Sequence, residues 1–180
     1  EKSKKDHLYA ISNVASFQNM TFPSFNIHGR NNEKEANKSL EVAFQSAKNF
    51  ADNPTGWLFL TGKFGCGKTH LAAAIANEVI QKGIPTLFLT VPDLLDWLRS
   101  SFMGDDPSFD ERFYEIREIP LLILDDLGTQ NSTPWAEEKL FQIINHRYLN
   151  RLPTVITSNL DAVKIDERIS SRINDRDLVM

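Results

Sequence analysis

The feature that most constrains this chain is the stretch 62–69, GKFGCGKT, which has the residue spacing of a phosphate-binding loop. An apolar run at 57–60 precedes it and a helix-forming run at 71–76 follows it, in the order strand, loop and helix. Glycines let the backbone curl so that several N–H groups point at phosphate oxygens, and the N-terminus of the following helix adds its positive dipole end. A glycine-rich turn that arose by chance would not be expected to lie between a strand and a helix. The stretch therefore predicts a polyphosphate site.

Lys68 and Thr69, at the end of this loop, carry the side chains that such a site needs. A lysine at this position reaches the β- and γ-phosphates, and the threonine hydroxyl ligates the Mg²⁺ that bridges them. We therefore expect the chain to bind magnesium together with the polyphosphate.

The composition is that of an ordinary globular domain. Hydrophobic residues make up 41% of the 180 residues and charged residues 24%, which predicts a single domain with a sizeable core. The net charge of −4 argues against a uniformly basic surface but leaves a local patch for nucleic acid open. The single cysteine, Cys66, can form no internal disulfide and indicates a reducing compartment, which we take to be the cytoplasm. No apolar run approaches the ~18 residues that span a bilayer, so no membrane partner is expected.

Apolar runs alternate with helical patterns along the chain. We expect strands at 57–60, 86–90, 121–124 and 154–157. We expect helices at 32–50, 71–82, 93–98, 109–119, 134–148 and in a short arginine-bearing segment at 167–172. Strands that alternate with helices of this length form a parallel sheet covered on both faces through right-handed crossovers. The predicted fold class is therefore α/β.

Residues 1–30 are expected to form an arm that packs on a single core domain of residues 31–180. The apolar side chains of the arm are spaced through polar residues: Phe17, Met20, Phe22, Phe25 and Ile27. One interpretation is that they patch the core, and another is that part of the arm lines an adenine pocket. Both can hold at once. Because the chain begins at Glu1, we expect it to be a piece of a longer protein.

Two carboxylates follow the third apolar run. Asp125 and Asp126 stand where a parallel strand is expected to end, and the carboxyl edge of such a sheet is where ligands bind. Asp125 is expected to hold Mg²⁺, directly or through water. Asp126 is expected to accept a proton from, or orient, the attacking water. Acid pairs at strand ends are also ordinary solvated turns, but the phosphate loop upstream favours the catalytic interpretation.

Polar residues also follow the fourth apolar run, at Thr157-Ser158-Asn159. Asn159 is expected beside the phosphates, where its amide orients the attacking water; the alternative is ordinary turn chemistry. Arg168 and Arg172 stand four residues apart and share one face of the last expected helix. They are either surface ion-pair partners or the source of an arginine that reaches the γ-phosphate bound by a neighbouring subunit.

Together these motifs resemble the DnaC/DnaI helicase loaders and the related IstB transposition helpers, which are AAA+ ATPases. The resemblance extends from about 22 to 172 and is carried by GKFGCGKTHLAAAIAN at 62–77, LILDDLG at 122–128, ITSN at 156–159 and ERISSR at 167–172. It implies a P-loop NTPase with the three-layer αβα sandwich of AAA+ proteins and a central parallel sheet. It also implies that ATP is the nucleotide and that its hydrolysis is slow and dependent on assembly or DNA.

The resemblance implies a role for each site residue. Nucleotide binding falls to Gly62, Gly65, Cys66, Gly67, Lys68, Thr69 and His70, and Mg²⁺ binding to Thr69 and Asp125. Catalysis falls to Lys68, Asp125, Asp126, Asn159 as sensor 1, and Arg172 as the arginine finger. Many AAA+ proteins have Glu where this chain has Asp126, so the rate of hydrolysis is in question, whereas binding should be less affected.

The resemblance also implies partners. In the loaders, the insertion that corresponds to 91–118 helps to line a path for single-stranded DNA, which places Phe102, Thr133 and Trp135 along that path. The alternative is that both rings belong to the core. A replicative hexameric helicase is the expected protein partner, through a region outside this chain. The subunits are expected to assemble head to tail into a spiral oligomer.

The expected function is that of the ATP-binding and ATP-hydrolysing core of a helicase loader, which places the replicative helicase on single-stranded DNA during replication initiation. The alternatives are an IstB-like transposition helper and a nonhydrolysing, ATP-gated interaction module. A small-molecule P-loop kinase is the weakest alternative, because it leaves Asn159 and the arginine-bearing helix without a role.

Overall fold

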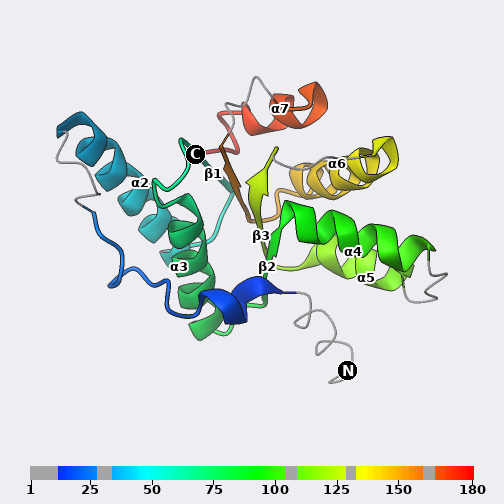
Figure 1. Cartoon of the computed structure of the whole chain (residues 1–180), viewed down its shortest axis with the longest axis horizontal. Coiled ribbons are helices and arrows are strands. Elements are labelled where there is room, and N and C mark those ends of the chain that lie inside the picture. Colours follow the sequence, from blue (N-terminus) through cyan, green and yellow to red (C-terminus); the bar gives the residue numbers. More distant parts are fainter. Residues whose placement is uncertain (1–11, 28–33, 104–108, 129–132, 160–164) are drawn as a thin grey trace.

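The computed structural model describes residues 12–27, 34–103, 109–128, 133–159 and 165–180 (Figure 1). These residues form a four-stranded, all-parallel sheet with the strand order β1–β4–β3–β2. The strands are β1 (Trp57–Thr61), β2 (Thr86–Thr90), β3 (Leu121–Leu127) and β4 (Thr154–Ser158). The predicted α/β class with a central parallel sheet is confirmed.

Helices cover both faces of this sheet. They are η1 (Asn13–Phe17), α2 (Lys34–Asp52), α3 (Lys68–Gln81), α4 (Val91–Met103), α5 (Phe109–Glu118), α6 (Pro134–Leu149) and α7 (Glu167–Ile173). Side chains of α2 and α3 form one core cluster with one face of the sheet, and those of α4 to α7 form a second cluster with the other face. In β4, Val155 belongs to the first cluster and Ile156 to the second, as in any strand buried on both faces. The molecule is therefore a three-layer sandwich (Figure 1).

The helix after β2 begins earlier than predicted. We expected it at 93, but α4 begins at Val91. The Thr90 hydroxyl accepts a hydrogen bond of 3.2 Å from the backbone N–H of Asp93, which caps the first turn. Pro92, inside that turn, needs no acceptor because it has no N–H. No helix in the described part of the chain combines the length and the apolar character needed to cross a bilayer.

Residues 178–180 pair in parallel with the outer edge of β1. Trp57 N donates to Leu178 O at 2.8 Å, and Met180 N donates to Trp57 O at 2.9 Å. Gly56, with φ of 67°, permits this approach, because a Cβ at that position would lie 2.7 Å from Leu178 O. The edge of β1 is thus covered by backbone hydrogen bonds instead of being left open.

The arm residues 12–27 run from the edge of β2 to the start of α3. The Ser12 hydroxyl lies 3.3 Å from both Phe88 O and Phe88 N, on the outer edge of β2. The Asn77 amide donates to Phe17 O and Met20 O at 3.1 and 2.9 Å, which ties the arm to α3. Phe22 is buried in the α2–α3 cluster, and Phe17, Met20 and Phe25 pack against that cluster. The arm therefore contributes to the core, as one of its two interpretations expected.

Arg147, on the inward face of α6, is fully buried. Its guanidinium donates to Thr154 Oγ1, Arg117 O and Ile119 O, each at 2.9 Å, and also to the carbonyl of Pro153. Burial lowers the pKa of this guanidinium to about 9, which leaves it charged at neutral pH. Arg147 thus joins α5 and α6 to the beginning of β4, at the sheet edge where that strand starts.

Candidate active site

The loop between β1 and α3 has the curled backbone that the glycines predict. Gly67, the residue before α3, has φ of 99°. This backbone conformation favours glycine, and a Cβ at this position would also lie 2.8 Å from Cε2 of Phe25 and displace that ring. Cys66, beside it, is exposed. The N-terminus of α3 and its first N–H groups therefore begin directly at this loop.

The Lys68 ammonium donates hydrogen bonds to neutral acceptors in the loop and at the end of β4. It donates to Gly62 O at 2.8 Å, to Lys63 O at 3.0 Å and to Asn159 Oδ1 at 2.7 Å. The last bond links the loop to the residue that follows β4, 91 positions along the chain. The structure therefore brings together two residues that the sequence predicted for one site.

Thr69 and Asp125 form a second link between α3 and the sheet. The Thr69 hydroxyl lies 3.1 and 3.0 Å from Oδ1 and Oδ2 of Asp125. Asp125 is only 4% exposed, and this burial raises the pKa of its carboxyl, while hydrogen bonds from Thr157 and Thr69 oppose the rise. A hydroxyl and a carboxylate are the hard oxygen ligands that Mg²⁺ prefers, and a cation would offset the cost of burying the negative charge. The two side chains therefore fit a magnesium site.

We expected β3 to end at the acid pair, but it continues to Leu127 through a β-bulge. Its register with β4 runs to Leu124↔Ile156 and resumes at Leu127↔Ser158. Asp125 and Asp126 therefore lie opposite a single residue of β4, and Asp126 has φ of 64°. The extra residue shifts the alternation of the strand, so that Leu127 joins the same core cluster as Leu124. The strand can continue because the two acids lie in the bulge and Leu127, not an acid, faces the hydrophobic cluster.

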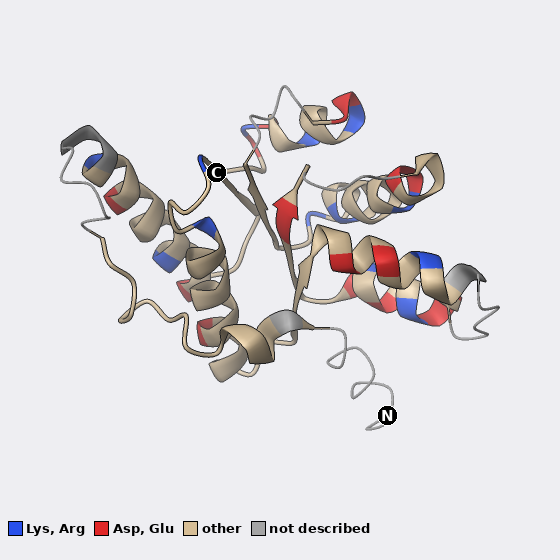
Figure 2. Cartoon of the chain, viewed as in Figure 1, with Lys and Arg blue, Asp and Glu red and all other residues tan. Residues whose placement is uncertain are grey.

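Asn159 connects Lys68 with Asp126. Its Oδ1 accepts from the Lys68 ammonium at 2.7 Å, and its Nδ2 donates to Asp126 Oδ1 at 2.6 Å. This amide orientation is the one that matches a cation on one side and a carboxylate on the other. The carboxyl end of β3, the end of β4 and the start of α3 thus meet at one edge of the sheet, where the acids of β3 are coloured red in Figure 2. The turn interpretation of Asn159 does not account for both bonds.

His70 contacts the arm instead of the phosphate loop. Its Nε2 lies 3.0 Å from Thr21 O and 3.2 Å from Ser24 Oγ. The Phe25 ring meets the imidazole edge to face, with 5.1 Å between the ring centres. Because Phe25 also contacts Gly67, the arm lies against both the end of the loop and the first turn of α3. The sequence interpretation did not assign these contacts, since they join residues that are 46 and 49 positions apart.

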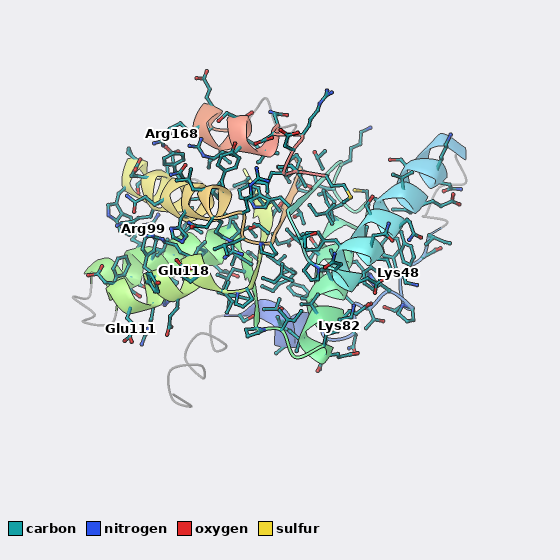
Figure 3. The ribbon with its side chains drawn as sticks, turned by 180° about the vertical axis from the view of Figure 1, so that it is seen from behind. Lys48, Lys82, Arg99, Glu111, Glu118 and Arg168 are labelled. Carbon is teal, nitrogen blue, oxygen red and sulfur yellow. The ribbon has the colours of Figure 1, made fainter. Side chains whose placement is uncertain are left out.

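The two arginines of α7 lie against α6 of their own chain. Arg172 donates through Nε and Nη2 to Asn145 Oδ1 at 2.9 and 2.6 Å, and its guanidinium lies 4.8 Å from the centre of the Phe141 ring. Arg168, labelled in Figure 3, pairs with Glu138 at 2.8 Å and lies 4.3 Å from the same ring. The described contacts of Arg172 are thus with α6 and, through Arg168 O and Ser171 Oγ, with its own helix, and none of them is with Lys68.

The residues proposed for DNA have structural contacts as well. The Thr133 hydroxyl accepts from Ala136 N at 3.3 Å and caps α6, although the residue itself is exposed. Trp135 is half-buried, packs against the α4–α7 cluster and has Lys139 Nζ 6.0 Å from its ring centre. The side chain of Phe102 lies outside the described residues. Roles for these residues in DNA binding stay predictions.

Two curated replication proteins are similar to this chain in sequence. The E. coli (strain K12) replicative helicase loader DnaC is 28% identical over 159 residues, which are 88% of this chain and 63% of that protein. The Bacillus subtilis (strain 168) replicative helicase loader DnaI is 36% identical over 103 residues, or 57% of this chain and 32% of that protein. The chain therefore spans less than two thirds of the length of these relatives.

Solved structures show the same fold. The crystal structure of the DnaC helicase loader superposes with a TM-score of 0.73 at 27% identity, over 92% of this chain and 98% of that one. The replication initiator DnaA bound to AMPPCP and single-stranded DNA superposes with the same TM-score at 23% identity, over 87% of this chain and 48% of that one. These are AAA+ P-loop domains, so the predicted fold is confirmed at that level. The model of the family described as IstB-like ATP binding protein matches residues 27–178, and the chain therefore belongs to that family.

Proposed function

We propose that this chain is the ATP-binding and ATP-hydrolysing core of a helicase loader, which places a replicative helicase on single-stranded DNA. One observation carries the ATPase part of the proposal. Lys68, Asn159 and Asp126 form one hydrogen-bonded chain, and Thr69 bonds to Asp125 beside it. These are the cationic, amide and carboxylate groups that phosphoryl transfer to water requires, gathered at one edge of the sheet.

The proposed nucleotide binding depends on the phosphate loop between β1 and α3. The backbone N–H groups at the start of α3 would hold the phosphates, and Lys68 would exchange its neutral acceptors for charged phosphate oxygens, which bind an ammonium more strongly. Thr69 and Asp125 would hold Mg²⁺, which withdraws charge from the phosphate oxygens. The arm, whose Phe25 lies beside Gly67, would line the adenine pocket.

The proposed hydrolysis depends on Asp126, which lies in the β-bulge. Asp126 would orient the attacking water and accept its proton, while Asn159 holds the Asp126 carboxylate and orients the same water. Arg172 would act on the nucleotide of a neighbouring subunit in a head-to-tail assembly, since its contacts within its own chain are with α6 and α7 and not with Lys68. For that role it has to leave Asn145. Because the arginine would come from a neighbouring subunit, hydrolysis would depend on assembly.

The loader assignment rests on the relatives. DnaC and DnaI are described as replicative helicase loaders, and the structure of DnaA contains single-stranded DNA. A replicative helicase and single-stranded DNA are therefore the partners we propose, with the half-buried Trp135 and the exposed Thr133 as candidate DNA contacts. A transposition helper is the second candidate, because the family model that matches 27–178 is described as IstB-like.

Two measurements test the proposal. Phosphate release is measured with and without single-stranded DNA, with Lys68→Ala as the matched inactive control, and DNA-stimulated turnover is expected only in the parent. Capture of a replicative hexameric helicase by the full-length protein tests the loader role. No phosphate release under any condition would leave a nonhydrolysing module, and capture of a transposase in place of a helicase would favour the second candidate.

A further inference from the structure

Thr157 lies on β4 beside both carboxylates and is 1% exposed. Its hydroxyl donates to Asp125 Oδ1 at 2.6 Å and accepts from the backbone N–H of Asp126 at 3.0 Å. One hydroxyl therefore contacts two consecutive residues of the neighbouring strand, using its proton for one and a lone pair for the other. These two bonds fix the direction of the O–H group.

The β-bulge explains why a hydroxyl is needed at this position. Thr157 is the single β4 residue that lies opposite Asp125 and Asp126. In a regular ladder each backbone N–H has a carbonyl partner on the next strand, but the bulge leaves an extra residue without a regular place in that pairing. The Thr157 hydroxyl supplies an acceptor to the Asp126 N–H. It thereby supports the left-handed conformation in which Asp126 is held, with φ of 64°.

We propose that Thr157 is a positioning residue, whose hydroxyl orients the Asp125 carboxylate toward the metal and holds the bulge that turns Asp126 toward Asn159. This inference rests on the proposed function of the site. Thr157 acts through the carboxylates, because the Asp125 oxygen that accepts its proton is also within 3.1 Å of the Thr69 hydroxyl. A partner of this kind reduces the freedom of a metal ligand, and its loss lowers metal affinity.

The neighbouring residue provides a matched control. Ser158 is also fully buried, and its hydroxyl donates to Leu127 O at 2.6 Å. That carbonyl lies beyond the bulge and belongs to no carboxylate residue. Removing the Ser158 hydroxyl costs a buried hydrogen bond of the same 2.6 Å length, in which neither carboxylate takes part.

The test compares Thr157→Val, Thr157→Ala, Thr157→Ser and Ser158→Ala. Calorimetry measures the affinity for a nonhydrolysable ATP analogue in EDTA and again in Mg²⁺, and the ratio of the two affinities is the metal-dependent gain. Thr157→Val and Thr157→Ala are expected to lower this gain by roughly 10–100-fold while the affinity in EDTA stays at the parent value. Thr157→Ser should restore the gain, and Ser158→Ala should retain it. Hydrogen exchange should be faster at the Asp126 amide in the hydroxyl-free variants.

An undiminished gain in folded Thr157→Val or Thr157→Ala would overturn the inference, as would a serine variant that behaves like the valine variant. A parallel loss of affinity in EDTA would also overturn it, because that result would indicate general damage to the phosphate loop. Failure of the proposed function has a different signature. In that case the parent itself would release no phosphate or show no metal-dependent gain.

Discussion

Replacing Asp126 by Asn separates the chemistry of this carboxylate from its place in the fold. Asp126 is held in a left-handed conformation, with φ of 64°, which Asn tolerates better than most residues. The amide has nearly the same shape as the carboxylate, and its oxygen can still accept the 2.6 Å hydrogen bond from Asn159 Nδ2. The backbone N–H bond to Thr157 is unchanged by the substitution. The variant should therefore fold and retain the bulge.

The expected effect on turnover is large. An amide cannot accept the proton of the attacking water, and loss of a general base costs roughly 10²–10⁴-fold in rate. With about 1.36 kcal/mol for each factor of ten, this loss corresponds to about 2.7–5.4 kcal/mol in the activation barrier. Nucleotide affinity should remain near that of the parent, because Lys68, Thr69 and Asp125 are untouched.

The assay measures phosphate release at saturating MgATP, together with calorimetric titration of a nonhydrolysable analogue. Asp126→Ala is the comparison variant, since it lacks both the base and the acceptor for Asn159 and also places a residue less suited to positive φ at this position. Undiminished turnover in Asp126→Asn would refute the assignment of Asp126 as general base and would leave it a purely structural role.

Three other outcomes are expected. Because burial raises the pKa of the Asp125 carboxyl, the folded state binds more protons than the unfolded state between its ordinary pKa of 3.8 and the raised value, and stability falls as pH rises through that window. Without metal, Asp125→Asn should therefore raise the urea midpoint more at neutral pH than near 3.8, and an equal rise at both would contradict this. Arg172→Ala should leave the ATP affinity of the monomer intact and lower turnover in assemblies, and mixing it with Lys68→Ala subunits should restore part of the activity; full activity of Arg172→Ala alone would exclude a finger in trans. Trp135→Ala should weaken binding of a fluorescent single-stranded oligonucleotide by ~1–3 kcal/mol if the ring stacks on a base, and unchanged binding in the folded variant would remove it from the DNA path.

The sequence located the phosphate loop because its signal is local. Residues 62–69 are contiguous in the sequence, and the strand before them and the helix after them can each be predicted from their own residue patterns. The meeting of Lys68 with Asn159 was also predictable, since the carboxyl ends of parallel strands share one edge of the sheet. A single general rule about sheets was therefore enough to predict that these two residues lie close together.

The bulge and the arm contacts were not predictable in the same way. The apolar pattern of β3 predicts which residues are buried but contains no information on the register of β3 with β4. The sequence therefore did not indicate that Asp125 and Asp126 lie opposite Thr157. His70 depends on a turn of the arm at Thr21 and Ser24, far away in sequence. For each of these residues the decisive partner comes from another element, and only the tertiary structure supplies it.

Arg147 shows a different limit. It continues the helical spacing of the buried residues Leu140, Ile143 and Ile144, as the neighbouring Tyr148 also does. Tyr148 is half-buried, whereas Arg147 is fully buried because three backbone carbonyls and a hydroxyl accept from its guanidinium. Burial of a charge depends on such partners, which a periodicity pattern does not contain.

The most direct test of the central claim is a calorimetric titration of the parent and Lys68→Ala with MgATP, combined with phosphate release from the same samples. The parent should bind MgATP and release phosphate, and Lys68→Ala should show neither, because the main counter-charge to the β- and γ-phosphates is absent. Equal affinity of the two proteins for MgATP would contradict the assignment of this loop as the nucleotide site.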